Sequence, residues 1–150
     1  MGRLYTIPLD AISVTTDADQ DIWEAVCNST YRAIIHAFSL TSSHTTDERA
    51  RLRLVRRSTT GTGGSALTEV AMDGGNARAA GTSFTSLVTT PGTIGDILHG
   101  WQWSQQNELL YLPTPEFRPV VSESARLALN LQTALGGTRT WSGYVVFEEL

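Results

Sequence analysis

The densest group of charged side chains is RARLRLVRR, residues 49–57, which holds five arginines in nine positions. Guanidinium groups bind carboxylates and phosphates through paired hydrogen bonds, so this segment has the chemistry to hold an acidic protein surface or a nucleic acid. Side chains alternate between the two faces of a β-strand, which sends the alanine and the two leucines to one side. The opposite side then carries a row of arginines outside the core, which is Arg49, Arg51, Arg53 and Arg57, together with Val55.

The charge of the whole chain decides between these partners. The formal net charge is −4, and without the five arginines the remaining six basic residues face fifteen acids, a net charge of −9. Nucleic-acid affinity needs a broad positive field and aromatic residues interleaved with the basic ones, and this chain has neither. We therefore expect the arginines to pair with carboxylates on a neighbouring strand or another subunit, with a solvated strand face as the second interpretation and nucleic acid as the third.

The segment WQW, residues 101–103, is the second feature with specific chemistry. Alternation places Trp101 and Trp103 on one face together with Ile97 and His99, which makes a broad aromatic surface. Three interpretations remain open, namely core packing, a subunit interface and a platform that stacks on a sugar. Tryptophan and arginine are enriched at protein interfaces. The candidate assembly-interface residues are therefore Arg49, Arg51, Arg53, Trp101 and Trp103.

Other motifs do not complete a catalytic or metal site. The glycine-rich run TTGTGGSAL lacks the lysine of a phosphate-binding loop, and the chain has no lysine at all. The alternating aspartates of DADQD are followed by Ile22, where a calcium loop requires glycine. His36 and His99 have no cysteine or carboxylate at ligand spacing, so we expect structural roles for both. We predict no catalytic residue, no cofactor, no metal and no enzymatic activity.

The elements that must position these side chains read as β-strands. With 150 residues the chain is long enough for one domain, residues 1–150. Period-two patterns predict strands rather than helices, and residues 125–133 alternate an apolar face with a polar one. Only residues 72–81 allow a helical turn. We therefore predict an all-β, antiparallel β-sandwich or jelly-roll-like domain with little helix. The expected strands are 3–9, 12–16, 21–27, 31–41, 49–57, 83–89, 95–104, 108–112, 125–133 and 138–150.

Composition also bears on location. No stretch approaches the ~20 apolar residues of a membrane span, and the start MGRLYT lacks the apolar region of a signal peptide. We expect synthesis in a cytoplasm and no membrane partner. The single cysteine, Cys27, has no partner for a disulfide, so we expect a small buried apolar residue.

Four segments carry a resemblance to a known family. These are MGRLYT at the start, STTGTGGSALTEV in the middle, YLPTPEFRPVVSESARLALNL and the ending WSGYVVFEEL. Together they resemble small virion proteins encoded among the structural genes of tailed bacteriophages.

The resemblance implies a capsid decoration or cement protein of β-sandwich type on the virion surface. Its expected partner is the major capsid protein, and a homotrimer is the expected oligomer because capsid lattices offer three-fold sites. A tail- or fibre-associated carbohydrate-binding module of a phage is the alternative.

Overall fold

The structure is a computed structural model that describes residues 2–75 and 78–150. Strands dominate it, and a single turn of 3₁₀-helix is the one helical element in these ranges. In chain order the elements are β1 (Arg3–Val14), β2 (Gln20–Cys27), β3 (Ala33–Ser42), β4 (Arg49–Arg57), β5 (Ser65–Leu67), β6 (Val70–Ala71), β7 (Thr82–Val88), β8 (Ile94–Ser104), β9 (Leu109–Tyr111), η1 (Pro115–Phe117), β10 (Val120–Val121), β11 (Arg126–Leu131) and β12 (Arg139–Glu149).

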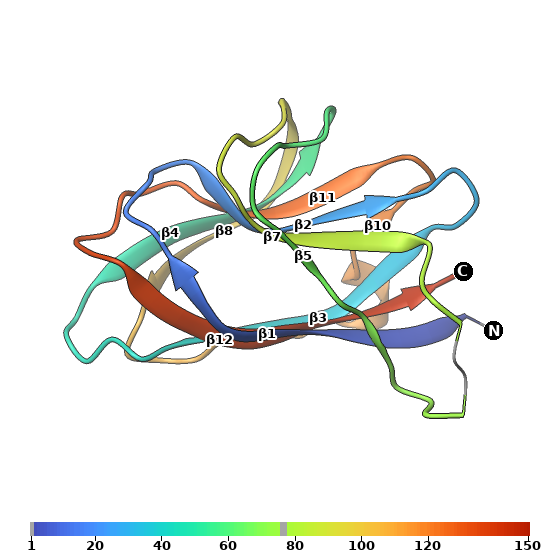
Figure 1. The fold of residues 1–150 in the computed structure, drawn as a ribbon, viewed down its shortest axis with the longest axis horizontal. Coiled ribbons are helices and arrows are strands. Elements are labelled where there is room, and N and C mark those ends of the chain that lie inside the picture. Colours follow the sequence, from blue (N-terminus) through green and yellow to red (C-terminus); the bar gives the residue numbers. More distant parts are fainter. Residues whose placement is uncertain (1, 76–77) are drawn as a thin grey trace.

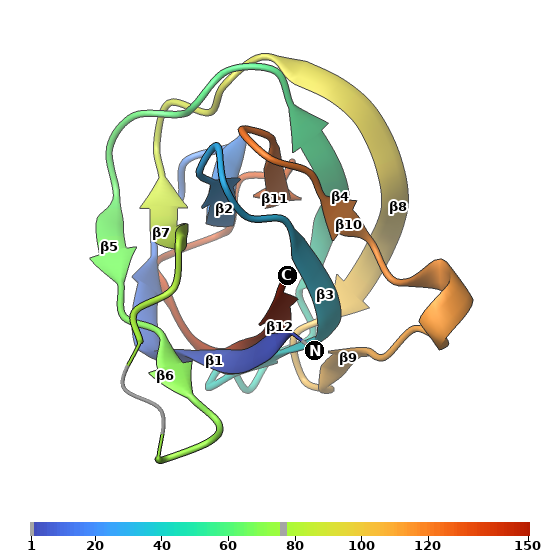
Figure 2. The same cartoon turned by 90° about the vertical axis from the view of Figure 1, so that its right-hand side faces the viewer.

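The strands form two antiparallel sheets that face each other (Figure 1). Sheet A has the order β10-β3-β12-β1-β6, with β9 also paired to β3, and sheet B has the order β5-β7-β2-β11-β4-β8. The end-on view shows both sheets curving around a common interior (Figure 2). The predicted all-β sandwich is confirmed.

Period-two patterning explains why the interior is continuous. On β12, Trp141, Val145 and Phe147 point inward and are fully buried, as the alternation of this strand predicts. Leu127 and Leu129 of β11 are equally buried in the opposite sheet. Each sheet therefore presents one apolar face, and the two faces join in a single core.

The first predicted pair of strands is one strand with an irregularity. β1 pairs with β12 along its whole length, but the register shifts between Leu9 and Ile12. Ala11 lies in this shift with a positive φ of 48°, and its backbone N–H donates to the Ser142 hydroxyl at 3.0 Å. The extra residue bends the strand as a β-bulge does, so the sheet continues through the polar residues that suggested a break.

Two further expectations are wrong. The described residues between 72 and 81 form bends and a turn at Gly74–Gly75 rather than a helical turn, because glycine has a poor helix propensity; residues 76 and 77 lie outside the described ranges. The outward side of β11 was expected in solvent, yet Ala128 and Asn130 are fully buried. Loops from elsewhere in the chain cover that side of sheet B.

The phase of β11 and β12 makes a prediction about stability. Leu129→Ala and Phe147→Ala should each lower the free energy of unfolding by roughly 2–5 kcal/mol, because each leaves a cavity in the shared core. Arg126→Ala is the matched control, since its side chain points to the outside and makes exposed hydrogen bonds to Thr60 and Ser124. Urea unfolding measures all three. Equal, small losses would contradict the assigned strand phase.

Candidate functional site

The outer face of β4 carries the predicted arginine row. Arg49 and Arg51 are exposed and Arg53 is half-buried, while the alternate positions face the core. Arg53 donates from Nε to the Asn130 amide oxygen at 3.0 Å and lies 3.8 Å from the Asp19 carboxylate. Within the described part of the chain, no ion pair involves Arg49 or Arg51. These two guanidinium groups remain open to a partner.

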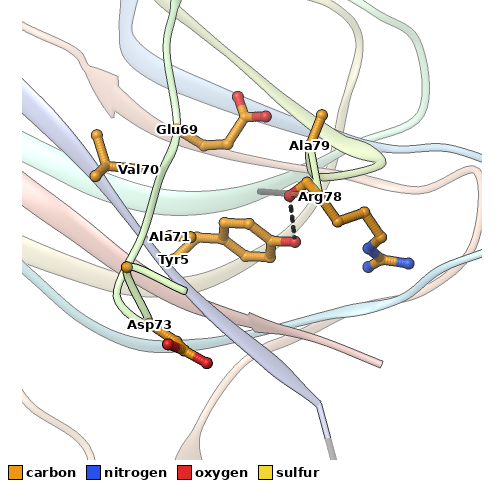
Figure 3. Close-up of a pocket in the computed structure, with 8 residues that line it drawn as sticks. Tyr5, Glu69, Val70, Ala71, Asp73, Arg78 and Ala79 are labelled. Carbon is orange, nitrogen blue, oxygen red and sulfur yellow. Dashed lines mark hydrogen bonds between the residues drawn. The ribbon is translucent and has the colours of Figure 1, made fainter. Parts of the chain in front are cut away.

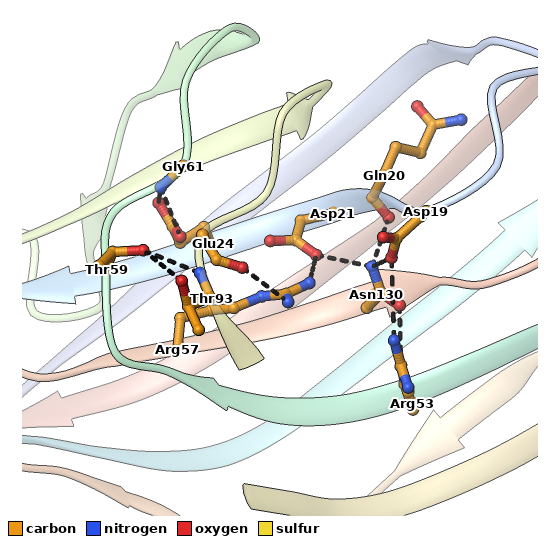
Figure 4. A network of polar contacts seen from close by, with 11 residues as sticks. Asp19, Gln20, Asp21, Glu24, Arg53, Arg57, Thr59, Gly61, Thr93 and Asn130 are labelled. Atoms are coloured by element: carbon orange, nitrogen blue, oxygen red, sulfur yellow. Dashed lines mark hydrogen bonds and ion pairs between the residues drawn. The ribbon is translucent and has the colours of Figure 1, made fainter. Parts of the chain in front are cut away.

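Arg57 does not belong to this exposed row, although its side chain points to the same face. Its side chain is 1% exposed and forms an ion pair with Asp21 at 2.7 Å, while Nη1 donates to the Gly92 carbonyl at 3.0 Å. Asn130 donates to the same Asp21 oxygen at 2.9 Å (Figure 4). The β4–β5 and β7–β8 loops contact this part of the sheet, because Gly61 donates to Glu24 and Gly92 accepts from Arg57. The sequence pattern gives the face of a side chain but not the loops that cover it.

Burial also changes the acidity of the carboxyl groups in this network. Burial raises the pKa of Asp21, and the hydrogen bonds from Arg57 and Asn130 act against the rise. Burial likewise raises the pKa of Glu24, while the Gly61 N–H, 3.2 Å from Oε2, lowers it. Glu24 thereby fixes the β4–β5 loop to β2 at the cost of keeping a carboxylate out of water.

The two tryptophans of WQW occupy different environments. Trp103 is 4% exposed, meets the Trp141 ring edge-on at 5.0 Å and donates from Nε1 to the Asn107 carbonyl at 2.8 Å. It pairs with Ala50 across the sheet, and this small residue leaves room for the indole. Trp103 is therefore a core residue, and its assignment to an assembly interface is wrong because no partner can reach it.

Trp101 closes the gap between the two sheets at the β8 edge. Its ring is half-buried and lies edge-on to both Phe38 and Tyr111, at 5.7 Å from each ring centre. The His99 ring lies 5.8 Å from the Trp101 ring and 5.4 Å from the Tyr111 ring. Aromatic packing accounts for most of the surface of Trp101, so an interface can use only its exposed margin.

A small hollow brings Arg51 and Trp101 together. It has a volume of about 150 Å³ and is lined by Arg51, Leu52, Gly100, Trp101, Gln102 and Gln132. Gln102 is the cross-strand partner of Arg51, and Gly100 has no side chain to fill the space. Sites for small ligands are usually about 300–1,000 Å³, so this hollow is a contact feature rather than a ligand pocket.

The most exposed apolar side chains lie on a segment that the sequence patterns did not single out. Residues 112–119, here called the arm, connect β9 to β10, and Figure 2 shows η1 standing out from the body of the protein. Leu112 is 69% exposed and Phe117 is 74% exposed. The three prolines at positions 113, 115 and 119 were the available signal, because they indicate a stiff, non-strand connection.

A larger hollow lies beside β1 and β6 (Figure 3). Its volume is about 450 Å³, and we call it the Tyr5 hollow. The Tyr5 hydroxyl donates to the Arg78 carbonyl at 3.1 Å, and the Arg78 guanidinium lies 2.6 Å from Glu149. The lining residues are Tyr5, Glu69, Val70, Ala71, Asp73, Gly74, Arg78 and Ala79.

The histidines have structural surroundings, as expected. His36 Nε2 lies 3.0 Å from Glu148 across neighbouring strands of sheet A, and His99 packs among aromatic rings. Over residues 2–75 and 78–150, no group of three or more histidine, cysteine or acidic side chains is arranged to hold a metal ion. Among the same residues, no helix is long and apolar enough to cross a membrane.

The fold and these surfaces define the chain as an all-β sandwich with an exposed apolar arm and two open arginines. No protein-family model, curated protein or solved structure matches it.

The buried carboxyl of Glu24 gives a prediction of pH dependence. A raised pKa means that the folded state binds the proton more tightly than the unfolded chain does, so this group's contribution to stability falls as pH rises above the ordinary value of 4.5. Glu24→Gln keeps an acceptor for Gly61 and removes this titration. We expect the variant to gain stability relative to the wild type at pH 7 and to lose that gain towards pH 4.

Urea unfolding across this pH range measures the effect of Glu24→Gln. Glu123→Gln is the control, because Glu123 is 42% exposed in a surface pair with Arg32 and the loss of such a pair changes stability only slightly. Parallel profiles for wild type and Glu24→Gln would contradict the cost assigned to the buried carboxylate.

The open arginines give a second prediction. Two exposed guanidinium groups on an acidic protein provide little attraction for polyphosphates at physiological salt, so we expect no micromolar binding to mixed-sequence DNA or RNA. Fluorescence anisotropy with labelled oligonucleotides measures this. Micromolar binding that weakens in Arg49→Gln and Arg51→Gln would show that phosphate, and not carboxylate, is the partner.

Proposed function

We propose that this protein is a structural component of a tailed-phage particle, a capsid decoration or cement protein that binds the assembled shell as a homo-oligomer, with a trimer as the expected form. The major capsid protein is the proposed partner. The resemblance of the segments at the two termini and in the middle of the chain supports the class of protein. The β-sandwich, which places its loops and edges outward on a rigid body, suits a passive structural role.

The exposed apolar surface is the observation that carries the proposal. Ile97, Leu110, Leu112 and Phe117 are each more than half exposed, and all belong to the β8 edge, β9 or the arm. The core of the sandwich is already closed, so these side chains add nothing to it. Apolar side chains grouped on one side of a folded protein are typical of a contact with another protein.

The second surface is the outer face of β4. Arg49 and Arg51 point away from the core, and within the described residues neither forms an ion pair, which leaves both available for a contact with an acidic shell. Each exposed ion pair contributes only about 0.2–1 kcal/mol. An oligomer repeats the same contacts at several lattice positions and so gains effective concentration, which makes weak contacts sufficient.

The decisive comparison uses particles made with and without this gene. Binding to the assembled shell but not to free capsid subunits should raise the temperature at which the shell disassembles. The protein should also be seen on the capsid surface by electron microscopy. If it lies only at the tail, the capsid proposal fails and the tail or fibre module replaces it.

Arginine variants test which face meets the shell. The double variant Arg49→Gln, Arg51→Gln removes two ion pairs from every copy, so its occupancy on particles at limiting concentration should fall by roughly tenfold or more. Arg32→Gln is the matched control, because this exposed arginine pairs with Glu123 within the chain. Quantitative electrophoresis of purified particles measures occupancy. Equal occupancy for all variants would exclude the β4 face as the contact.

The surface around WQW, on which the carbohydrate-binding alternative was based, offers no open site for a sugar. The hollow beside Arg51 is small for a sugar ring, and the Trp101 ring packs on Phe38 and Tyr111 instead of forming an open platform. Sugar binding would therefore be tested only if the protein were found at the tail.

A further inference from the structure

We infer that the arm of one copy inserts Phe117 into the Tyr5 hollow of the next copy, which makes a head-to-tail contact between identical chains. This inference rests on the proposed function, because it specifies how the expected oligomer is built. It addresses two features that the single chain leaves unused, a protruding apolar side chain and an open hollow.

Hydrogen bonds at both ends hold the arm in a fixed position. β9 and β10 at its two ends both pair with β3, and the Ile35 N–H donates to the Pro119 carbonyl at 3.0 Å. Arg56 adds a hydrogen bond to the Val120 carbonyl at 2.9 Å. Between these anchors, prolines restrict the backbone, and a turn of 3₁₀-helix presents Phe117 at 74% exposure. A rigid arm loses little entropy on binding, which favours affinity.

The hollow offers an apolar surface of suitable size. Its volume of about 450 Å³ lies within the usual range for sites that enclose a ring, and Val70, Ala71 and Ala79 contribute apolar surface beside Tyr5. Val70 is itself half exposed, so insertion of an aromatic ring would remove apolar surface from water on both partners.

Charges of both signs flank Phe117, with the exposed Glu116 before it and Arg118 after it. Arg118 follows Phe117 directly, and within the described residues it forms no ion pair and its buried Nε has no hydrogen-bond partner. In the hollow, the Glu69 carboxylate accepts a hydrogen bond from the Ala80 N–H, and the Asp73 carboxylate accepts one from the Gly75 N–H. Among the described residues, no cation forms an ion pair with Glu69 or Asp73. The hollow can therefore accept Arg118, while Arg78 in its lining can accept Glu116.

The positions of the two features exclude contact within one chain. Figure 2 shows η1 and the β6 region, which carries the hollow, on opposite sides of the sandwich. A contact between two different patches of identical chains is heterologous, and such contacts close into rings when the rotation between neighbours allows it. A closed ring of three copies is the form that meets a three-fold site.

Complementary variants test this arrangement. Phe117→Ala removes the ring that fills the hollow, and Ala79→Trp fills the hollow from an exposed position outside the core. Each variant alone should lose the oligomer, with self-association at least about 30-fold weaker, as for an aromatic hot spot. Mixed together they should form a dimer, because one variant keeps the arm and the other keeps the hollow. Ile97→Ala is the control, because Ile97 is an apolar residue outside the arm that is also more than half exposed.

Mass measurement by light scattering at micromolar concentration reads the oligomeric state, with 16.3 kDa for one chain. Unchanged urea unfolding shows that each variant still folds. A wild-type trimer, two monomeric variants and a mixed dimer are the expected results. A monomeric wild type, or a trimer that survives both substitutions, would overturn the inference. Wild-type protein that is monomeric but present on particles would overturn the inference and the expected oligomer but leave the capsid-binding role standing. A trimer that is absent from particles would leave the inference standing and overturn the capsid-binding role.

Discussion

The apolar face of each sheet has to be covered by the other sheet, and most of the structure follows from this requirement. Trp23 of sheet B contacts Phe38 of sheet A at 5.6 Å and Phe84 of its own sheet at 5.9 Å. Phe84 in turn contacts Phe147 across the interior at 5.0 Å. These rings connect strands that are distant in the sequence. Aromatic side chains bury large areas, so the core depends on sheet-to-sheet packing rather than on local contacts.

The outer side of sheet B carries a buried polar network. Asp21, Arg57 and Asn130 are buried there under two loops, and hydrogen bonds connect them. A buried ion pair is a weak source of net stability, because desolvation offsets much of the attraction. Its stronger effect is on geometry, since a carboxylate without its guanidinium would be costly in this position. The network therefore fixes loop positions that apolar packing alone would leave undefined.

The side chains available for contacts with other molecules lie at the edges of the sandwich, because its interior is fully packed. Trp101 seals the β8 edge, the arm extends beyond it, and the open arginines lie on the neighbouring strand β4. The Tyr5 hollow lies on the other side, next to the buried Glu149, whose carboxylate accepts hydrogen bonds from the Gly81 and Thr82 N–H groups. The proposed contacts therefore use opposite sides of one rigid body.

Alternation of apolar and polar residues was sufficient to predict the longer strands and the inward side of most of them, because a strand's side chains have a period of two wherever it lies. It missed the short strands β5, β6 and β10, which are too short to show a period. It placed Leu129 and Phe147 in the core and Arg49 and Arg51 outside. It could not separate Arg57 from Arg51, or Trp103 from Trp101, since each pair shares a face. The depth of a side chain depends on which loops and edges come to cover it. The tertiary structure alone decides this, because those covering segments are distant in the sequence.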